Sequence, residues 1–275
     1  MKSTLPRRIF GLAAALLLTT FPALASAPQP VSVLYAGSLV TPMEGPIRLA
    51  LAAQGIDFLG QGGGSKALAH LISAGIKNPD VFISVNPKLV TGLGAKVSKA
   101  YAFAGTSLGI GWSDKSKFAS SFARAAGKKN ALLAALSVRG LVIGRTDPKL
   151  DPKGAYTTQA MTILAGSSGE RRILGADENP AQTFPEEDLL TRVETGQADV
   201  GFFYKTEAVA RGLHFIALPG AAAMSDKITY TLAVMKNAPH PTAANAFAQF
   251  ILNGRGKSIL EKAGLQYLRT LRKSR

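Results

Sequence analysis

Short apolar runs alternate along this chain with segments of helical periodicity. The apolar runs, rich in β-branched and aromatic residues, lie at 31–36 (VSVLYA), 56–60 (IDFLG), 80–85 (DVFISV), 107–112 (SLGIGW), 141–145 (LVIGR), 199–203 (DVGFF) and 228–234 (ITYTLAV). Helices are predicted near 39–54, from a Gly-rich turn to residue 74, after residue 154, near 186–195 and in two segments close to the C-terminus. Strand–helix alternation of this kind predicts α/β sheets with parallel strands.

The order of these elements predicts two lobes, the second inserted into the first. No fixed-period repeat or low-complexity linker divides the chain. We expect residues 26–108 and 226–275 to form one lobe and residues 109–225 the other. Each lobe would hold a parallel or mixed sheet flanked by helices, and two crossing strands would join them. Ligands of open α/β sheets bind in the crevice at the carboxyl ends of the strands.

The N-terminus has the pattern of an export signal. One Lys and two Arg within the first eight positions precede an apolar run from Ile9 to Leu24, and small residues follow. This pattern predicts a signal peptide over residues 1–25, with cleavage after Ala25. A retained anchor would need about 20 uninterrupted apolar residues, and Pro22 interrupts this run. The pair Arg7-Arg8 leaves both the general and the twin-arginine export routes open.

Composition narrows the class of protein further. The 275 residues include no cysteine and have a formal net charge of +15. Without cysteine the chain has no disulfide, thiolate metal site or lipid-bearing residue. Lys and Arg are scattered except for a short cluster at 269–275 without interleaved aromatic residues, so we expect no nucleic-acid partner. We expect a periplasmic, soluble monomer whose positive field attracts small anions.

The stretch GQGGGSK (60–66) is a candidate anion-binding turn. A P-loop requires Gly before its Lys and Ser or Thr after it, but Ser65 precedes Lys66 and Ala67 follows it. Two positions that a P-loop needs for nucleotide binding are therefore occupied by other residues. What remains is a Gly-rich turn whose free N–H groups favour an anion at a helix N-terminus. The alternative is that the glycines only make a tight strand-to-helix turn.

Residues for catalysis are scarce. The three histidines (70, 214 and 240) are far apart and no HExxH motif occurs, so a zinc hydrolase is not expected. Residues 105–109 match G-x-S-x-G around Ser107, but that motif needs a helix after its serine. A strand-like run follows Ser107 instead. We therefore predict no enzymatic activity and no cofactor.

Two serines occupy corresponding positions in neighbouring strand–helix units. Ser38 follows the run at 31–36 and Ser65 follows the run at 56–60, and each begins a helix. A hydroxyl beside free backbone N–H groups at a helix N-terminus can bind an anion. Either serine alone would be an ordinary N-cap. Two of them on adjacent parallel strands are expected to face the same crevice.

Several segments together carry a family resemblance. They are AGSL, GGGSKAL followed by PDVFISV, LDPKGAYTTQAM (150–161), VETGQADVGFFYKTEAVARGLHFIALP (193–219) and the C-terminal NAPHPTAANAFAQFILNGRGKSILEKAGL. The chain resembles the periplasmic solute-binding proteins that deliver molybdate and tungstate to ABC transporters, except over 113–140, where the likeness is poor. The resemblance implies the type II periplasmic-binding-protein fold. It also implies molybdate or tungstate as ligand in an interlobe cleft, and an ABC permease in the inner membrane as partner.

The resemblance implies specific ligand contacts. In that family, serine hydroxyls and backbone N–H groups of both lobes hold the oxyanion. These contacts correspond to Ser38 and Ser65 in the first lobe and to the Asp151 turn in the second, with Tyr204 supporting the site.

One branch of the family adds two carboxylates that bind the metal directly and complete an octahedron. By spacing they correspond to Asp151 and Glu186, with Asp147 and Glu187 as alternatives. Lys153 departs from that branch, which usually has a small residue there. Without a ligand role, Asp151 would only form a turn and Glu186 would only be an acid in the first turn of a helix. Molybdenum and tungsten can expand their coordination and sulfur and phosphorus in these anions cannot, so two acids would exclude sulfate and phosphate.

Two rival functions remain open from the sequence. The first is a receptor for sulfate, phosphate or an organic anion, because AGS and GGS motifs also occur in relatives that bind other oxyanions. The second is a hydrolase that uses Ser107.

Overall fold

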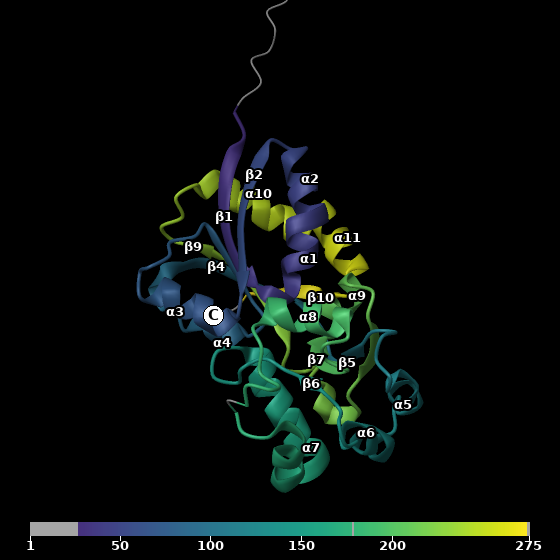
Figure 1. Cartoon of the computed structure of the whole chain (residues 1–275). Helices are drawn as coiled ribbons and strands as arrows, with labels where there is room; N and C mark the ends of the chain where they lie inside the picture. The colour runs from purple at the N-terminus through teal and green to yellow at the C-terminus, as the bar shows by residue number, and fades with distance from the viewer. Residues whose placement is uncertain (1–26, 178, 274–275) are drawn as a thin grey trace, which may run out of the picture.

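The computed structural model describes residues 27–177 and 179–273 (Figure 1). The predicted signal peptide over 1–25 lies outside the described residues. Within the described part of the chain, no helix combines the length and the hydropathy of a membrane span.

The first lobe is built on a six-stranded mixed sheet in the order β10-β4-β9-β3-β1-β2. Strand β1 pairs in parallel with β2 and β3, and the remaining pairs are antiparallel. The strands are β1 (Gln29–Ala36), β2 (Ile56–Gly63), β3 (Val81–Ser84), β4 (Val97–Gly105), β9 (Thr229–Met235) and β10 (Gln266–Lys273).

Helices flank this sheet, and the stretch predicted as one helix near 39–54 is broken into four short pieces. Pro42 and Pro46 lie inside it, and Gly45 has the non-helical angles φ −97° and ψ −105°. The prolines interrupt the helix, because a proline removes a backbone donor and crowds the preceding turn. The elements are η1 (Gly37–Leu39), α1 (Val40–Pro42), η2 (Met43–Ile47), α2 (Arg48–Ala52), α3 (Ser65–Ser73), α4 (Pro87–Thr91), η3 (Gly94–Lys96), α10 (Pro241–Leu252) and α11 (Arg255–Lys262).

The second lobe holds a four-stranded sheet in the order β6-β7-β5-β8, in which only β6 and β7 are parallel. Its strands are β5 (Leu108–Trp112), β6 (Ile143–Gly144), β7 (Val200–Tyr204) and β8 (His214–Ala217). Its helices are α5 (Ala119–Arg124), α6 (Lys129–Leu136), α7 (Pro152–Leu174), α8 (Glu186–Thr195), α9 (Lys205–Ala210) and η4 (Gly220–Ala223).

The prediction of a two-lobed α/β fold is confirmed, and both sheets are mixed. Figure 1 shows the larger sheet with α10 and α11 in the upper half and α5, α6 and α7 in the lower half, with α8 and α9 between them. The chain passes from the first sheet to the second between β4 and β5, and returns between η4 and β9. The lobe boundaries at 108/109 and 225/226 stay a prediction.

The glycines at 60–63 form strand rather than a turn, which corrects the expected Gly-rich turn. They pair with the last residues of β1, in a register that sets Val33 opposite Gly60 and Ala36 opposite Gly63. None of these three glycines has a positive φ. A Cβ at Gly62 would lie 2.5 Å from the Val40 side chain. Close packing therefore explains Gly62, and only Gly64 remains between the strand and helix α3.

Three strands were missed from the sequence. Strands β4, β8 and β10 have mixed or basic compositions, and β4 (VSKAYAFAG) carries Ser98 and Lys99 near its start. It becomes a strand because β9 and β10 pair with its two edges, and such long-range pairing overrides local propensity.

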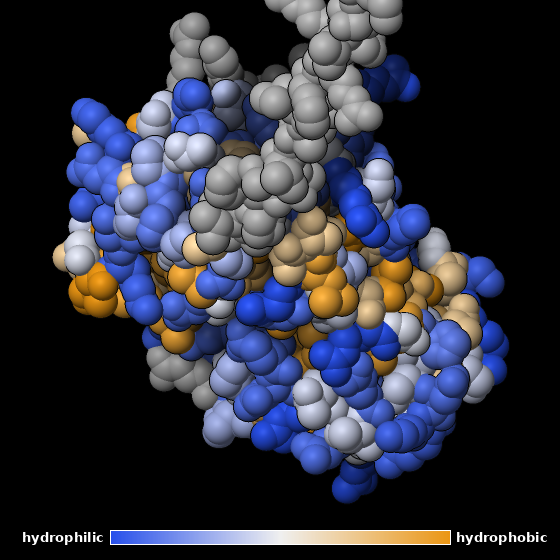
Figure 2. Space-filling view, turned by 90° about the horizontal axis from the view of Figure 1, so that it is seen from above, coloured by the Kyte–Doolittle hydropathy of each residue, from blue (hydrophilic) through white to orange (hydrophobic). Residues whose placement is uncertain are grey.

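Aromatic rings fill the core of the first lobe. Phe58 lies between Tyr35 and Phe247, at centroid distances of 6.1 and 5.9 Å. On the face seen in Figure 2, apolar residues are interspersed with hydrophilic ones.

Candidate functional site

The first lobe contributes two buried serines at the carboxyl ends of β1 and β2. The Ser38 hydroxyl lies 3.0 Å from the Tyr230 hydroxyl, and the Ser65 hydroxyl oxygen accepts from the Val85 N–H at 3.4 Å. Neither serine is an N-cap, because Ala36 and Gly64 hold those positions and make no side-chain capping bond. The hydroxyl proton of Ser65 is therefore left to donate elsewhere.

The second lobe contributes two buried carboxylates, each with one oxygen engaged. Asp151 is the N-cap of α7, and its Oδ1 accepts from the Lys153 N–H at 2.8 Å. Glu186 is the first residue of α8, and its Oε1 lies 3.2 Å from Lys153 Nζ. The second oxygens, Asp151 Oδ2 and Glu186 Oε2, are buried without a hydrogen-bond partner among the described residues.

The two lobes meet at these residues. A Cβ added to Gly37 would fall far inside van der Waals contact with Glu186 Oε2, so this carboxylate oxygen sits directly against the Gly37 backbone. A Cβ at Gly64 would lie 3.1 Å from the Leu150 carbonyl oxygen and 3.8 Å from Asp151 Cα. The structure thus brings the second-lobe acids next to the residues that precede Ser38 and Ser65.

Tyr204 lies at the end of β7 and is the N-cap of α9. Its backbone N–H donates to Glu207 Oε2 at 2.8 Å. Its hydroxyl is buried and lacks a hydrogen-bond partner in the part of the chain that the structure describes. A donor without a partner is available to a bound anion.

Lys153 is the main feature that the sequence analysis did not place. It was noted only as a departure at a loop position, but it lies in the first turn of α7 with a fully buried side chain. Its ammonium group forms ion pairs with Glu186 and with Glu207. These pairs connect helix α7 to helices α8 and α9 at this site. Neither Glu207 nor Tyr230 was identified either. Tyr230 is distant in sequence from the predicted site residues, so no local pattern identifies it. Glu207 lies three residues after Tyr204, and this spacing was the one local signal.

Burial dominates the electrostatics of this cluster. It raises the pKa of Glu186 well above its usual range and raises the pKa of Asp151 and Glu207, while the Lys153 ammonium opposes each shift. Burial lowers the pKa of Lys153, but Glu186, Glu207 and Asp151 raise it by more, so the net direction is upward. Burial likewise raises the pKa of Tyr204. Lys153 thus stays a cation and Tyr204 a neutral donor at neutral pH.

The alternative acids are less buried than Asp151 and Glu186. Glu187 is exposed, and Asp147 is half-buried with its Oδ1 accepting from the Lys149 N–H at 2.6 Å. Both line the wall of a cavity of about 380 Å³ that also reaches Gly64, Asp151 and Glu186. Burial therefore favours Asp151 and Glu186 as the inward pair.

The described residues contain no group of three or more His, Cys, Asp or Glu side chains that could hold a metal ion. The site instead offers two carboxylate oxygens, hydroxyl donors and backbone. Such a set suits a ligand that brings its own oxygen atoms.

Ser107 lies in the crossing between the lobes. Strand β4 ends two residues before it and β5 begins immediately after it, and its carbonyl accepts from the Lys205 N–H at 2.9 Å. The helix required after a nucleophile elbow is replaced by a strand.

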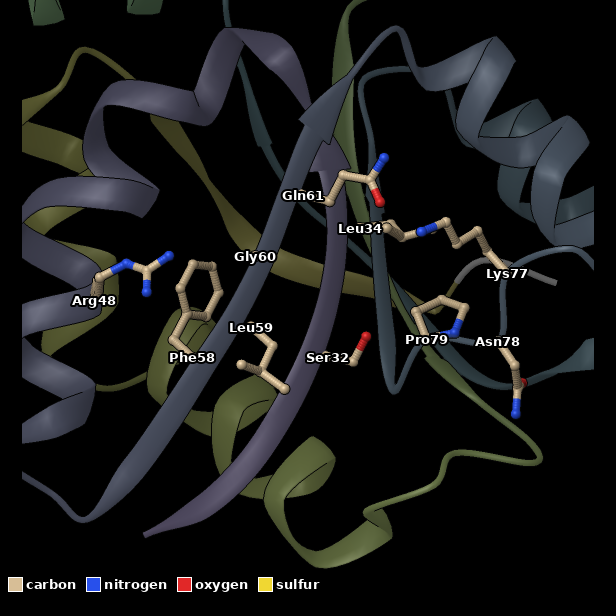
Figure 3. Close-up of a pocket in the computed structure, with 10 residues that line it drawn as sticks. All are labelled: Ser32, Leu34, Arg48, Phe58, Leu59, Gly60, Gln61, Lys77, Asn78 and Pro79. Carbon is tan, nitrogen blue, oxygen red and sulfur yellow. The ribbon is translucent and has the colours of Figure 1, made fainter.

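A second cavity of about 380 Å³ runs along the edge strand β2. Figure 3 shows Arg48 and Phe58 on one side of this strand and Gln61 and Lys77 on the other. Ser32 and Leu34 of β1 and residues 58–61 of β2 also line it, so the cavity lies beside the middle of these strands. No predicted site residue lines this cavity.

The fold and site define a two-lobed solute-binding protein, and sequence comparison agrees. The profile of the bacterial extracellular solute-binding protein family matches residues 31–266, so the chain belongs to that family. It is 31% identical to an uncharacterized solute-binding protein of Halobacterium salinarum, over 89% of this chain and 87% of the relative.

Two further relatives have names that specify a ligand. A putative ABC transporter molybdenum-binding protein of Haloferax volcanii is 30% identical over 71% of this chain and 62% of the relative. A molybdate/tungstate-binding protein of Pyrococcus abyssi is 24% identical over 60% of this chain and 61% of the relative. The resemblance to molybdate- and tungstate-binding proteins is thereby confirmed.

Solved structures confirm the fold. The periplasmic molybdate-binding protein of Azotobacter vinelandii superposes with a TM-score of 0.65 at 18% identity, covering 88% of this chain and 99% of that one. The sulfate-binding protein of Mycobacterium tuberculosis gives 0.62 at 14% identity, covering 88% of each chain. The fold alone therefore does not distinguish one oxyanion from another.

Proposed function

We propose that this chain is an exported, non-catalytic substrate-binding protein that closes its lobes on molybdate or tungstate and delivers it to an ABC permease in the inner membrane. Membership of the solute-binding family supports the binding role. The names of the Haloferax and Pyrococcus relatives support the ligand and the transporter partner.

The observation that carries the choice of ligand is the pair of partnerless carboxylate oxygens, Asp151 Oδ2 and Glu186 Oε2. A carboxylate near an oxyanion costs about 1–4 kcal/mol of repulsion at solvent-like to surface dielectric. The interaction becomes favourable when the carboxylate oxygen binds the hexavalent metal itself. Two such oxygens and the four of the metalate complete six-fold coordination.

Two hydroxyl groups support contacts to the oxygens of the metalate. The hydroxyl of Ser65 can donate, because the oxygen of the same group already accepts from Val85. The buried hydroxyl of Tyr204 lacks a partner among the residues described. We assign Ser38, Ser65 and Tyr204 to the oxygens of the ligand, and Asp151 and Glu186 to its metal.

Calorimetric titration of the apo protein with molybdate, tungstate, sulfate and phosphate tests this proposal. We expect heat of binding with the two metalates and none, or far weaker binding, with sulfate and phosphate. At free metalate 1,000 times the dissociation constant, the protein should gain about 4 kcal/mol of stability. A large rise in melting temperature should follow, and ATP should produce none. If neither metalate binds, the proposed ligand is wrong.

The proposed location has its own test. A signal peptide over 1–25 predicts that the mature chain begins at Ser26 and fractionates with soluble periplasmic proteins. N-terminal sequencing of the fractionated protein decides this, and an intact N-terminus in the membrane pellet would contradict it. Gel filtration tests the expected monomer.

A further inference from the structure

We propose that Lys153 is a positioning residue that makes Glu186 a one-oxygen ligand and so sets the preference for metalates over sulfate and phosphate. This inference rests on the proposed function. The side chain of Lys153 is fully buried within the cluster that the second lobe presents.

The ammonium group of Lys153 holds one specific oxygen of Glu186. Nζ lies 3.2 Å from Glu186 Oε1, whereas Oε2 has no bond among the described residues and lies against Gly37. With Oε1 engaged by Nζ, Oε2 is the carboxylate oxygen that lies against the first-lobe backbone. Groups around a metal ligand fix its orientation, and their loss typically costs 10–100-fold in affinity.

Lys153 is itself held in place from a third element. Glu207 on α9 pairs with Nζ through Oε1 and accepts from the Tyr204 N–H through Oε2. The Phe203 and Tyr204 rings lie 5.6 and 5.8 Å from Nζ. The ammonium group therefore cannot leave Glu186 for solvent. A buried ion pair is weak evidence of added stability and better evidence of specified geometry.

The orientation of Asp151 does not depend on the Lys153 side chain. Its Oδ1 bonds the backbone N–H of Lys153, and any residue except proline at position 153 keeps that bond. A side-chain change at position 153 therefore removes the bond to Glu186 Oε1 and a favourable charge near Asp151, while the backbone bond that orients Asp151 stays intact.

The test is the double variant K153M/E207Q, which removes one positive and one negative charge and leaves the net charge of the cluster unchanged. A glutamine at position 207 can still accept from the Tyr204 N–H. We expect molybdate and tungstate to bind at least tenfold more weakly by calorimetry, with sulfate and phosphate changed less than about threefold. X-ray absorption on the metalate-loaded variant should show fewer than six oxygen neighbours or a wider spread of distances than in the wild type.

A double-mutant cycle with E186Q provides the control. If Lys153 acts through Glu186, K153M/E207Q should cause little further loss in the E186Q background. An equal loss for all four anions, a loss that persists with E186Q, or an unchanged metalate affinity would each overturn the inference. Should K153M/E207Q fail to fold by apo melting, K153Q/E207Q has the same net charge and keeps polar atoms in the cluster. Wild-type titration is read first, so failure of the proposed ligand is distinguishable from failure of this inference.

Discussion

The two lobes face each other across the site with opposite chemistry. The first lobe presents Gly37-Ser38 and Gly64-Ser65, which are uncharged and offer hydroxyls and backbone. The second presents Asp151 and Glu186, buried acids that would repel most anions. An edge of hydroxyls and backbone N–H groups can bind any oxyanion, so it does not discriminate between oxyanions. Under the proposed function, selection comes from the charged edge, because only a ligand with an accessible metal centre gains from it.

The edges also differ in what holds them. The Ser38 and Ser65 hydroxyls each contact one neighbouring group within their own lobe. The acids depend on a network across α7, α8 and α9 that centres on Lys153. Each prediction below tests this difference between the two edges.

The largest effect is expected where the edges touch. Gly37→Ala would place a methyl group where Glu186 Oε2 now lies, so the carboxylate must move or the lobes must open. Overpacking of this kind costs about 1–3 kcal/mol, and at the upper end metalate affinity falls about a hundredfold. Calorimetry measures it. Gly63→Ala is the matched control, because its Cβ would lie an ordinary 3.6 Å from the Leu68 side chain. Wild-type affinity in Gly37→Ala would show that the two edges do not meet in the bound state.

Neutralising either acid should distinguish two roles for the acids: ligands of the metal, or charges that only repel the anion. Glu186→Gln and Asp151→Asn should each weaken molybdate and tungstate binding more than tenfold, above about 1.4 kcal/mol, because a neutral amide is a poor ligand for a hard metal centre. Glu187→Gln and Asp147→Asn change neighbouring acids that lie outside the inward pair, and should have little effect. If the acids only repelled the dianion, the first two variants would bind it more tightly, and X-ray absorption would show four oxygen neighbours instead of six.

Metalate affinity should decrease with falling pH if the two acids bind the metal. Burial raises the pKa of Glu186 and Asp151, with Lys153, Glu207 and Tyr204 as the charged and titratable groups around them. A carboxylate must be ionised to bind the metal, so metalate affinity should fall as pH drops through these raised pKa values. The slope is at most about tenfold per pH unit for each proton that binding displaces. Titrations from pH 8 downward measure it. Sulfate should show the reverse slope, and a metalate affinity that rises at lower pH would contradict ligation.

The smallest effects should come from the first-lobe hydroxyls. Ser38→Ala and Ser65→Ala should each weaken binding by about 0.5–1.5 kcal/mol, the net value of one hydrogen bond, with similar losses for every oxyanion that binds. Ser107→Ala should leave binding unchanged, since Ser107 lies in the crossing between the lobes. A selective loss for metalates alone in the serine variants would remove the distinction between the two edges.

Local patterns were enough to predict much of the architecture. Apolar runs without polar alternation, such as the one at β3, identify strands buried on both faces, and the order of elements predicts the two lobes. The motifs around Ser38 and Ser65 could be located because strand ends and helix starts are encoded within a few residues. The acids Asp151 and Glu186 were found only through a family resemblance, since each also fits a common local role at the start of a helix.

Other features depended on contacts that no local pattern contains. Gly62 resembles part of a flexible turn, yet it is strand because β1 pairs beside it and Val40 leaves no room for a side chain. Lys153 appeared as an anomaly in a loop, but folding encloses it between Glu186 and Glu207, which lie 33 and 54 residues away in sequence. The sequence by itself predicted seven of the ten strands among the described residues and the polar residues near their ends, because those preferences are local. Only the tertiary structure decided which oxygen of each acid is free, because burial and long-range partners set the orientation and charge of a side chain.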